Sequence, residues 1–297
     1  MSKPQIAAHL IVGARPEPFL PALLRSLIGV ADTVIVDENS ALSESDNLRI
    51  LTNSFFGQQQ ALRLIRSTFT DFCTARNRCI NLHAEQDTAQ WVAFVDADEV
   101  HGPAAKIIAN NLDHVPPSIN FIDGYTYHFV QAFDWYRSIE RRMTFHRFSP
   151  SLRWVGAVHE HLEGIVETRL AIPYLYAHYG HVLPAQRHAE KNLQYAQLGD
   201  QGSAVYPDDF DTIDPEDYFA SSWPQLMRFF GEHAPAADTV IAELKDTLAG
   251  HFATSTKLVQ AYRGGLRGKI LRAFWRANYD LRWRSRWLDP RARRLLR

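Results

Sequence analysis

The chain has 297 residues, of which 46% are hydrophobic, and its formal net charge is −1. These values indicate a globular protein with a substantial core and exclude a disordered chain. No stretch reaches the roughly 18 apolar residues that a membrane-spanning helix needs, and residues 1–13 lack a plausible signal-cleavage site, so we expect a cytoplasmic protein. Cys73 and Cys79 lie six positions apart on one predicted helix, too far for a disulfide, and are expected to be reduced thiols.

Strand and helix patterns alternate over the first hundred residues. Apolar runs predict strands at 6–12, 33–36, 62–65 and 91–95, and the predicted helices cover 19–28 and 71–84. Asp71 is the expected N-cap of the second helix. Such alternation predicts right-handed β-α-β units, and therefore an α/β fold with a mostly parallel, Rossmann-like sheet flanked by helices.

The pattern changes after residue 102. A helix is predicted at 104–112, antiparallel strands extend the sheet within 124–158, a further strand covers 172–176, and helices follow from Ala185. Residues 199–215 are rich in Ser, Asp, Gly and Pro, which is typical of a loop. We therefore expect a catalytic domain over 1–205 and a helical C-terminal region over 206–297.

The segment WVAFVDADEV at 91–100 is an apolar strand followed directly by Asp96, Asp98 and Glu99. In an open α/β sheet, ligands bind beyond the carboxyl ends of the strands. Two aspartates one residue apart at such an end can form an oxygen-ligand site for Mg²⁺ or Mn²⁺ carrying a diphosphate. The alternative is that these acids solvate a loop or cap a helix.

Other polar residues follow predicted strands or lie on the helix at 71–84. Asp37 ends the second strand and is placed to accept from a ribose hydroxyl or a base N–H, although a turn-forming role is the alternative. The Arg76-Asn77-Arg78 segment offers guanidinium groups for a phosphate. Because residues two apart cannot share one helical face, one of the two arginines is expected to be a solvated surface residue.

Histidines occur near a second strand end and on a late strand. His159 and Glu160 follow an aromatic strand, where a shielded carboxylate could act as a general base and an imidazole could bind metal or phosphate. A polar surface turn is the alternative. His178 and His181 could likewise bind a ligand, and the alternative is that they are hydrogen-bonded residues of the core. No H-E-x-x-H or C-x-x-C spacing is present, so the sequence predicts no zinc site.

The C-terminal segment is strongly basic and aromatic. Residues 263–297 hold 12 of the 32 Lys and Arg residues, and their acids are Asp280 and Asp289 alone. Arginines interleave with aromatic residues, which suits the headgroup region of an anionic membrane. The alternatives are docking on the acidic remainder of the chain and nucleic-acid binding, and that acidic remainder argues against nucleic acid.

Taken in order, the segments VIVDENS, FCTARNRCI, WVAFVDADE, RWVGAVHEHLEG and AHYGH resemble glycosyltransferase family 2, which has the GT-A fold. The resemblance covers roughly residues 5–200. It implies an inverting transfer of a sugar from a nucleotide-diphosphate donor, for which a UDP-sugar is expected, to a carbohydrate or lipid-linked acceptor in envelope polysaccharide or glycolipid synthesis. The basic segment would then hold the enzyme at the inner face of the cell membrane.

The resemblance also implies roles for individual residues. Glu160 would be the catalytic base, with His159 beside it. The expected donor-binding residues are Val12, Asp37, Arg76, Asn77 and Asp96, and the expected ligands of Mn²⁺ or Mg²⁺ are Asp96, Asp98 and His178. The segment at 13–17, Gly-Ala-Arg-Pro-Glu, departs from the Asn-Glu that is usual after the first strand, and His181 stands where Tyr is common.

Two other function classes remain open from the sequence. A nucleotidyltransferase would use similar carboxylates but normally has a Gly-rich, basic loop after the first strand, which Gly-Ala-Arg-Pro matches weakly. A non-catalytic membrane or carbohydrate-binding adaptor would not need the acidic residues. The motifs of Rossmann dehydrogenases, P-loop proteins and serine hydrolases are absent.

Overall fold

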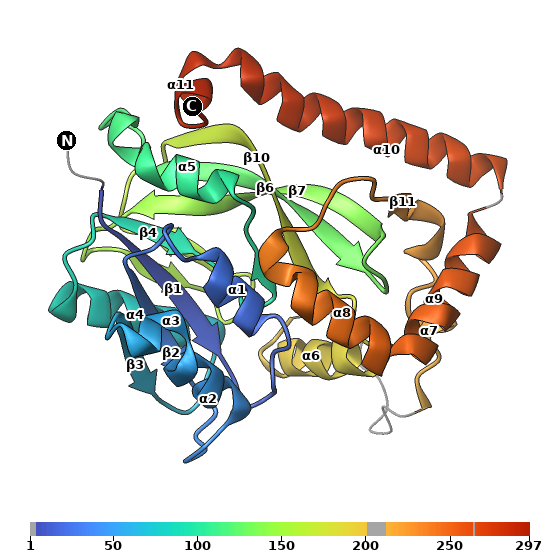
Figure 1. The fold of residues 1–297 in the computed structure, drawn as a ribbon, viewed down its shortest axis with the longest axis horizontal. Helices are drawn as coiled ribbons and strands as arrows, with labels where there is room; N and C mark the ends of the chain where they lie inside the picture. Colours follow the sequence, from blue (N-terminus) through green and yellow to red (C-terminus); the bar gives the residue numbers. More distant parts are fainter. Residues whose placement is uncertain (1–3, 201–211, 264) are drawn as a thin grey trace.

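The computed structural model describes residues 4–200, 212–263 and 265–297. A mixed sheet forms its centre, with the strand order β3-β2-β1-β4-β7-β6-β10-β5 and with β11 pairing with β7 (Figure 1). The strands are β1 (Ile6–Val12), β2 (Thr33–Glu38), β3 (Leu62–Arg66), β4 (Trp91–Phe94), β5 (Glu99–Val100), β6 (Phe121–Val130), β7 (Trp135–Arg147), β10 (Arg169–His181) and β11 (Met227–Arg228). A separate hairpin consists of β8 (Arg153–Val155) and β9 (His161–Glu163).

Helices cover the sheet, as the sequence predicts for the α/β class. They are α1 (Leu20–Ser26), α2 (Asp46–Asn53), α3 (Phe55–Gln58), α4 (Phe72–Gln86), α5 (Ala104–Asn110), α6 (Ala185–Gln197), α7 (Pro215–Tyr218), α8 (Asp238–Thr247), α9 (Ala249–Tyr262), α10 (Leu266–Arg284) and α11 (Pro290–Arg294). Asp71 is the N-cap of α4, because its carboxylate accepts from the backbone N–H of Thr74 at 2.7 Å. This N-cap was predicted and is confirmed.

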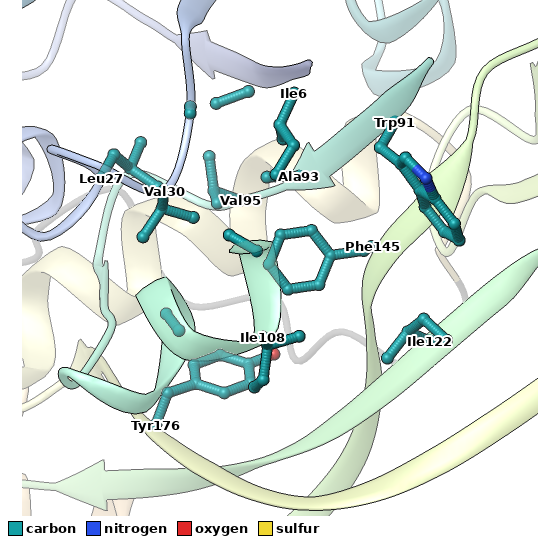
Figure 2. Close-up of a cluster of buried hydrophobic side chains, with 14 of the residues drawn as sticks. Ile6, Leu27, Val30, Trp91, Ala93, Val95, Ile108, Ile122, Phe145 and Tyr176 are labelled. Carbon is teal, nitrogen blue, oxygen red and sulfur yellow. The ribbon is translucent and has the colours of Figure 1, made fainter. Parts of the chain in front are cut away.

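The strands β3, β2, β1 and β4 are parallel, and β1, β2 and β4 are buried along most of their length, whereas β3 at the sheet edge is partly exposed. Successive side chains of a strand point to opposite faces. Accordingly, Ile6, Ala8 and Leu10 of β1 join a core cluster with α1 and α5, and Ala7 packs with Cys79 of α4 on the other face. Figure 2 shows part of the larger cluster, in which Ile6 lies near Ala93 and Val95.

The other half of the sheet is built from long strands. β7 is antiparallel to both β4 and β6, and β6 is parallel to β10. The predicted antiparallel strands within 124–158 are thus confirmed. The predicted strand at 172–176 is longer than expected, since β10 spans Arg169–His181. The prediction from apolar runs was too short because β10 also contains polar residues.

The C-terminal region packs against the body of the protein. The predicted domain border at 205 lies outside the described residues. Beyond it, α10 runs across the top of the view from α9 to α11 (Figure 1). Trp275, Tyr279 and Trp283 of α10 pack on a core cluster formed by the sheet, and Leu295 is 1% exposed in the core cluster that contains β1. The C-terminal region therefore docks on the body of the protein, which was one of the alternatives considered for it.

The described residues contain no helix that is long and apolar enough to cross a membrane. Cys73 and Cys79 are both free thiols, as predicted, and burial raises the pKa of the Cys79 thiol to about 12.

Candidate functional site

A cavity of about 1450 Å³ opens beyond the carboxyl ends of β1, β2 and β4. The β8–β9 hairpin and α6 form its other walls. Its lining residues include Val12, Asn39, Arg76, Asp96, Asp98, Arg142, His159, Glu160, Gly180, His188 and Lys191. The structure therefore brings the predicted acidic segment, the Arg of the A-R-N segment and the predicted base together at one place.

Asp96 lies between two arginines. Its Oδ1 accepts from Arg76 Nη2 at 2.9 Å, and its Oδ2 accepts from Arg142 Nη2 at 3.0 Å. Burial by itself would raise the pKa of Asp96, but the two guanidinium groups hold it below the usual value. Both carboxylate oxygens of Asp96 are thus already engaged by the protein.

Asp98 has the opposite environment. Its Oδ1 is buried and has no hydrogen-bond partner among the described residues, and it lies 3.4 Å from His178 Nε2. Burial raises the pKa of Asp98, since no guanidinium contacts this carboxylate. A Cβ atom at Gly180 would clash with Asp98 Oδ2, so glycine fits beside this carboxylate where a side chain would displace it. An unpartnered carboxylate oxygen next to an imidazole fits a divalent cation.

The cluster contains more carboxylates than guanidinium groups. Four carboxylates, those of Asp96, Asp98, Glu99 and Glu160, surround the guanidinium groups of Arg76 and Arg142. Burial raises the pKa of Glu99 to about 8, and its Oε1 lies 3.4 Å from Arg142 Nη1. A carboxyl group with a pKa of about 8 is mostly protonated near pH 7, and Asp98 is the carboxylate of this cluster that forms no ion pair with an arginine of the described residues.

Glu160 reaches the same arginine from the β8–β9 connection. Arg76 Nε donates to Glu160 Oε1, and its guanidinium lies 4.4 Å from the ring centroid of Phe94 and 5.3 Å from that of Trp154. The predicted base and the predicted donor-binding arginine are therefore joined by a direct hydrogen bond. His159, by contrast, has an exposed side chain, with a φ of 53° and with its Nε2 3.3 Å from Asp200 Oδ2.

Asn77 does not line the cavity. Its amide donates to the backbone carbonyl of Trp154 and accepts from the backbone N–H of Trp154, both at 2.8 Å. This pair of bonds attaches β8 to α4 and so fixes the hairpin that carries Glu160.

Asp37 is also outside the cavity lining. It is fully buried, and its carboxylate accepts from Ser67 Oγ at 2.6 Å and from Arg78 Nη1 at 3.1 Å. Asn39, two residues later, lines the cavity instead, and its backbone N–H donates to the carbonyl of Val12. The expectation that one arginine of the A-R-N-R segment is merely solvated was wrong, because Arg76 pairs with Asp96 and Arg78 pairs with the fully buried Asp37.

The sequence reasoning missed Arg142, Glu17 and Lys191. Arg142 lies in the middle of β7. The alternating residue pattern of that strand does not indicate that Arg142 pairs with Asp96. Burial and the nearby Asp98 raise the pKa of Glu17 to about 7. The Lys191 ammonium lies 5.8 Å from the Tyr195 ring centroid and forms no salt bridge with the described residues. Burial favours its neutral form, yet Tyr195, Asp98 and other nearby acids raise the pKa of Lys191 and keep it charged.

No protein-family model and no curated protein matches the sequence. Among solved structures, the chain is similar to the mannosyltransferase PcManGT from Pyrobaculum calidifontis in complex with GDP-Man and Mn²⁺, with 15% identity and a TM-score of 0.42 over 99% of this chain and 85% of that one. It is also similar to glucosyl-3-phosphoglycerate synthase from Mycobacterium tuberculosis in complex with Mn²⁺, UDP and phosphoglyceric acid, with 12% identity and a TM-score of 0.31 over 41% and 43% of the chains. At these values neither likeness identifies an activity or a metal for this chain.

The arrangement has the parts that transfer from a diphosphate requires. Among the described residues, Asp98 keeps an oxygen without a hydrogen-bond partner that can hold a cation, and the Lys191 ammonium lines the same cavity without a salt bridge. A second carboxylate, Glu160, is fixed by an arginine on another wall. Lys191 is the lysine among the described lining residues, and its nearby acids keep it in the charged form, which is not a nucleophile.

Proposed function

We propose that the protein is a metal-dependent glycosyltransferase that moves a sugar from a nucleotide-diphosphate donor to an acceptor hydroxyl with inversion. The single observation that carries the proposal is Asp98, a cavity residue at a strand end whose buried Oδ1 has no hydrogen-bond partner among the described residues. The ordered segments that resemble glycosyltransferase family 2 support it. The placement of the D-A-D segment and the H-E segment on one cavity supports it as well.

Asp98 and the Nε2 atom of His178 would hold Mn²⁺ or Mg²⁺, with Asp96 as a further ligand if Arg76 or Arg142 releases one of its oxygens. A bound divalent cation would offset the charge that develops on the leaving diphosphate. Lys191 lies on the α6 wall and would add a positive charge for the same phosphates.

The donor nucleoside would lie near the ends of β1 and β2. Val12 and Asn39 line the cavity there and are joined by the 2.9 Å backbone bond from Asn39 to Val12. Asp37 would support this wall from behind, because its carboxylate is occupied by Ser67 and Arg78. A UDP-sugar remains the proposed donor.

Glu160 would take the proton of the acceptor hydroxyl as its oxygen attacks the anomeric carbon. The bond from that carbon to the diphosphate oxygen breaks in the same displacement, so no covalent enzyme intermediate is needed. Arg76 fixes Oε1 of Glu160, while Oε2 makes no hydrogen bond with the described residues and can receive the proton. His159, at the exposed rim of the cavity, would contact the acceptor.

The base assignment is tested with Glu160→Gln. We expect turnover of UDP- and GDP-linked hexoses to fall about 10²- to 10⁴-fold, because a positioned base contributes a factor of that size, while the KM for the donor changes little. Product analysis of the wild-type protein should show the nucleoside diphosphate, whereas pyrophosphate release would indicate a nucleotidyltransferase.

The matched control is Glu17→Gln, which removes another carboxylate of the cavity, one whose pKa is raised to about 7. Full turnover in Glu160→Gln together with its loss in Glu17→Gln would move the base role to Glu17. If the wild-type protein turns over none of the donors and binds no nucleotide with Mn²⁺, the adaptor alternative holds.

We also propose that α10 contacts an anionic membrane at a cytoplasmic face, where a lipid-linked acceptor would be available. The aromatic residues Trp275, Tyr279 and Trp283 face the body, so they do not carry this proposal. The proposal is carried by a separate apolar stripe on α10, because residues four and seven positions apart share one face of a helix. Its members are Leu266, Ile270, Phe274 and Leu281, which are 73%, 61%, 60% and 71% exposed.

Because the tail contributes to the core, point substitutions test the membrane proposal better than truncation. We expect Ile270→Gln with Phe274→Gln to weaken sedimentation with phosphatidylcholine/phosphatidylglycerol vesicles at least about tenfold, since each buried apolar side chain contributes about 1.5–3 kcal/mol. Val166→Gln is the control, because Val166 is 74% exposed and lies outside the C-terminal region. Equal sedimentation of all three proteins would contradict the proposal.

A further inference from the structure

Three histidines gather on the strands next to Asp98. His128 lies on β6, and His178 and His181 lie on β10. One ring nitrogen from each can be chosen so that all three atoms lie within 4.8 Å of one another. Ligand atoms around a tetrahedral zinc lie roughly 3.4 Å apart, so a modest closing of the side chains would complete such a site.

The register of the strands explains this gathering. His178 pairs directly with His128 on the neighbouring parallel strand, so the two side chains share one face of the sheet. Residues three apart on a regular strand point to opposite faces. The register shifts between His178 and His181, and the extra residue brings His181 back to the face of His178. This irregularity contains Gly180, the position where Asp98 leaves no room for a side chain.

Two of the three imidazoles already have a carboxylate on one side. His178 Nε2 lies 3.4 Å from Asp98 Oδ1, and His128 Nε2 lies 3.3 Å from Glu140 Oε2. The other ring nitrogen of each, Nδ1, is buried and has no hydrogen-bond partner among the described residues. Histidines that bind metal usually present one nitrogen to the ion and the other to a carboxylate or carbonyl. His128 and His178 have this arrangement.

We propose that His128, His178 and His181 form a binding site for a divalent cation of the Zn²⁺, Co²⁺ or Ni²⁺ class. Imidazole nitrogen suits these ions, whereas Mg²⁺ and Mn²⁺ prefer oxygen, so this site differs in chemistry from the carboxylate site of the proposed function. The two sites share His178, which would present Nε2 to the carboxylate site and Nδ1 to this one. It goes beyond that function because it needs no nucleotide. The ion would have access through the cavity, since Gly180 and His188 line it and the His188 ring stacks on His181 at 4.5 Å.

The test is a titration of the full chain with Co²⁺, followed by its visible absorption, in excess Mg²⁺ that occupies oxygen-rich sites. We expect one tightly bound Co²⁺ with the spectrum of nitrogen coordination. His181→Ala and His128→Ala should each weaken this binding by more than about 100-fold, because each removes a ligand. Glu140→Gln should weaken it about 10- to 100-fold, the usual effect of losing the carboxylate behind a ligating histidine.

Binding of UDP with Mn²⁺ separates this proposal from the proposed function. His181→Ala should keep that binding, which also shows that the variant folds, and Asp96→Asn should keep the Co²⁺ site. His114→Ala is the control for an exposed histidine outside the cluster. The proposal is overturned if wild-type protein shows no nitrogen-coordinated Co²⁺, or if His128→Ala and His181→Ala, with UDP binding intact, bind Co²⁺ as the wild type does.

Discussion

Asp98→Asn is expected to lower the affinity for a nucleoside diphosphate in the presence of Mn²⁺ by at least about 100-fold, or about 2.8 kcal/mol. The substitution keeps the size of the side chain and removes the charge that would hold the cation. It should not destabilise the fold. Because burial raises the pKa of Asp98, its charged form is disfavoured in the folded protein, and we expect the neutral amide to leave Tm unchanged or to raise it.

Calorimetric titration and thermal unfolding of the same samples measure both effects. Asp113→Asn provides the control, as this exposed carboxylate lies outside the cavity lining and should change neither value. A structural role for Asp98 predicts the reverse pattern, with a lower Tm and with binding weakened only in proportion to unfolding. That pattern would remove the basis for the metal site.

Arg76→Met is expected to cost about 3 kcal/mol of the free energy of unfolding. Arg76 is 8% exposed and pairs with both Asp96 and Glu160, so its removal leaves the partly buried Glu160 without its arginine and Asp96 with Arg142 alone. The loss of its contacts with the rings of Phe94 and Trp154 adds to the effect. Arg76→Lys should retain part of the stability, because it keeps the charge but loses the planar fork.

Urea unfolding measures this difference, with Arg49→Met as the matched control. Arg49 pairs with Asp46 at 2.7 Å, but its side chain is 73% exposed, and we expect its loss to change stability by no more than about 0.5 kcal/mol. If Arg76→Met and Arg49→Met gave the same small change, the ion pairs at Arg76 would contribute no more to stability than a solvated surface pair.

The fold was predictable where the physical signal is local. Apolar runs indicated β1, β2, β3 and β4, and a single carboxylate indicated the start of α4. The length of β10 was not predictable from apolar runs, because neighbouring elements cover residues of β10 that are polar. The docking of α10 was left open between two readings, since the same aromatic residues suit a membrane surface or a protein core.

The motifs of the site were predictable from the sequence, but the hydrogen-bond partners of their side chains were not. The strand-end rule placed Asp96 and Asp98 at a cavity, but it could not say that Asp96 is held by two arginines while Asp98 keeps a free oxygen. Arg142 and Lys191 come from elements far along the chain, and only the tertiary fold brings them to the carboxylates. The histidine cluster depends on a strand irregularity that no spacing rule for helices or turns would reveal.

The central claim is that Asp98 receives a divalent cation that accompanies a nucleoside diphosphate in the cavity. A crystal structure of the full chain with Mn²⁺ and UDP, with the manganese located by its anomalous signal, tests it most directly. We predict manganese at bonding distance from Asp98 Oδ1, roughly 2.2 Å, with the diphosphate between it and Lys191. Manganese and diphosphate bound elsewhere, with no manganese at the Asp98 carboxylate, would contradict the account.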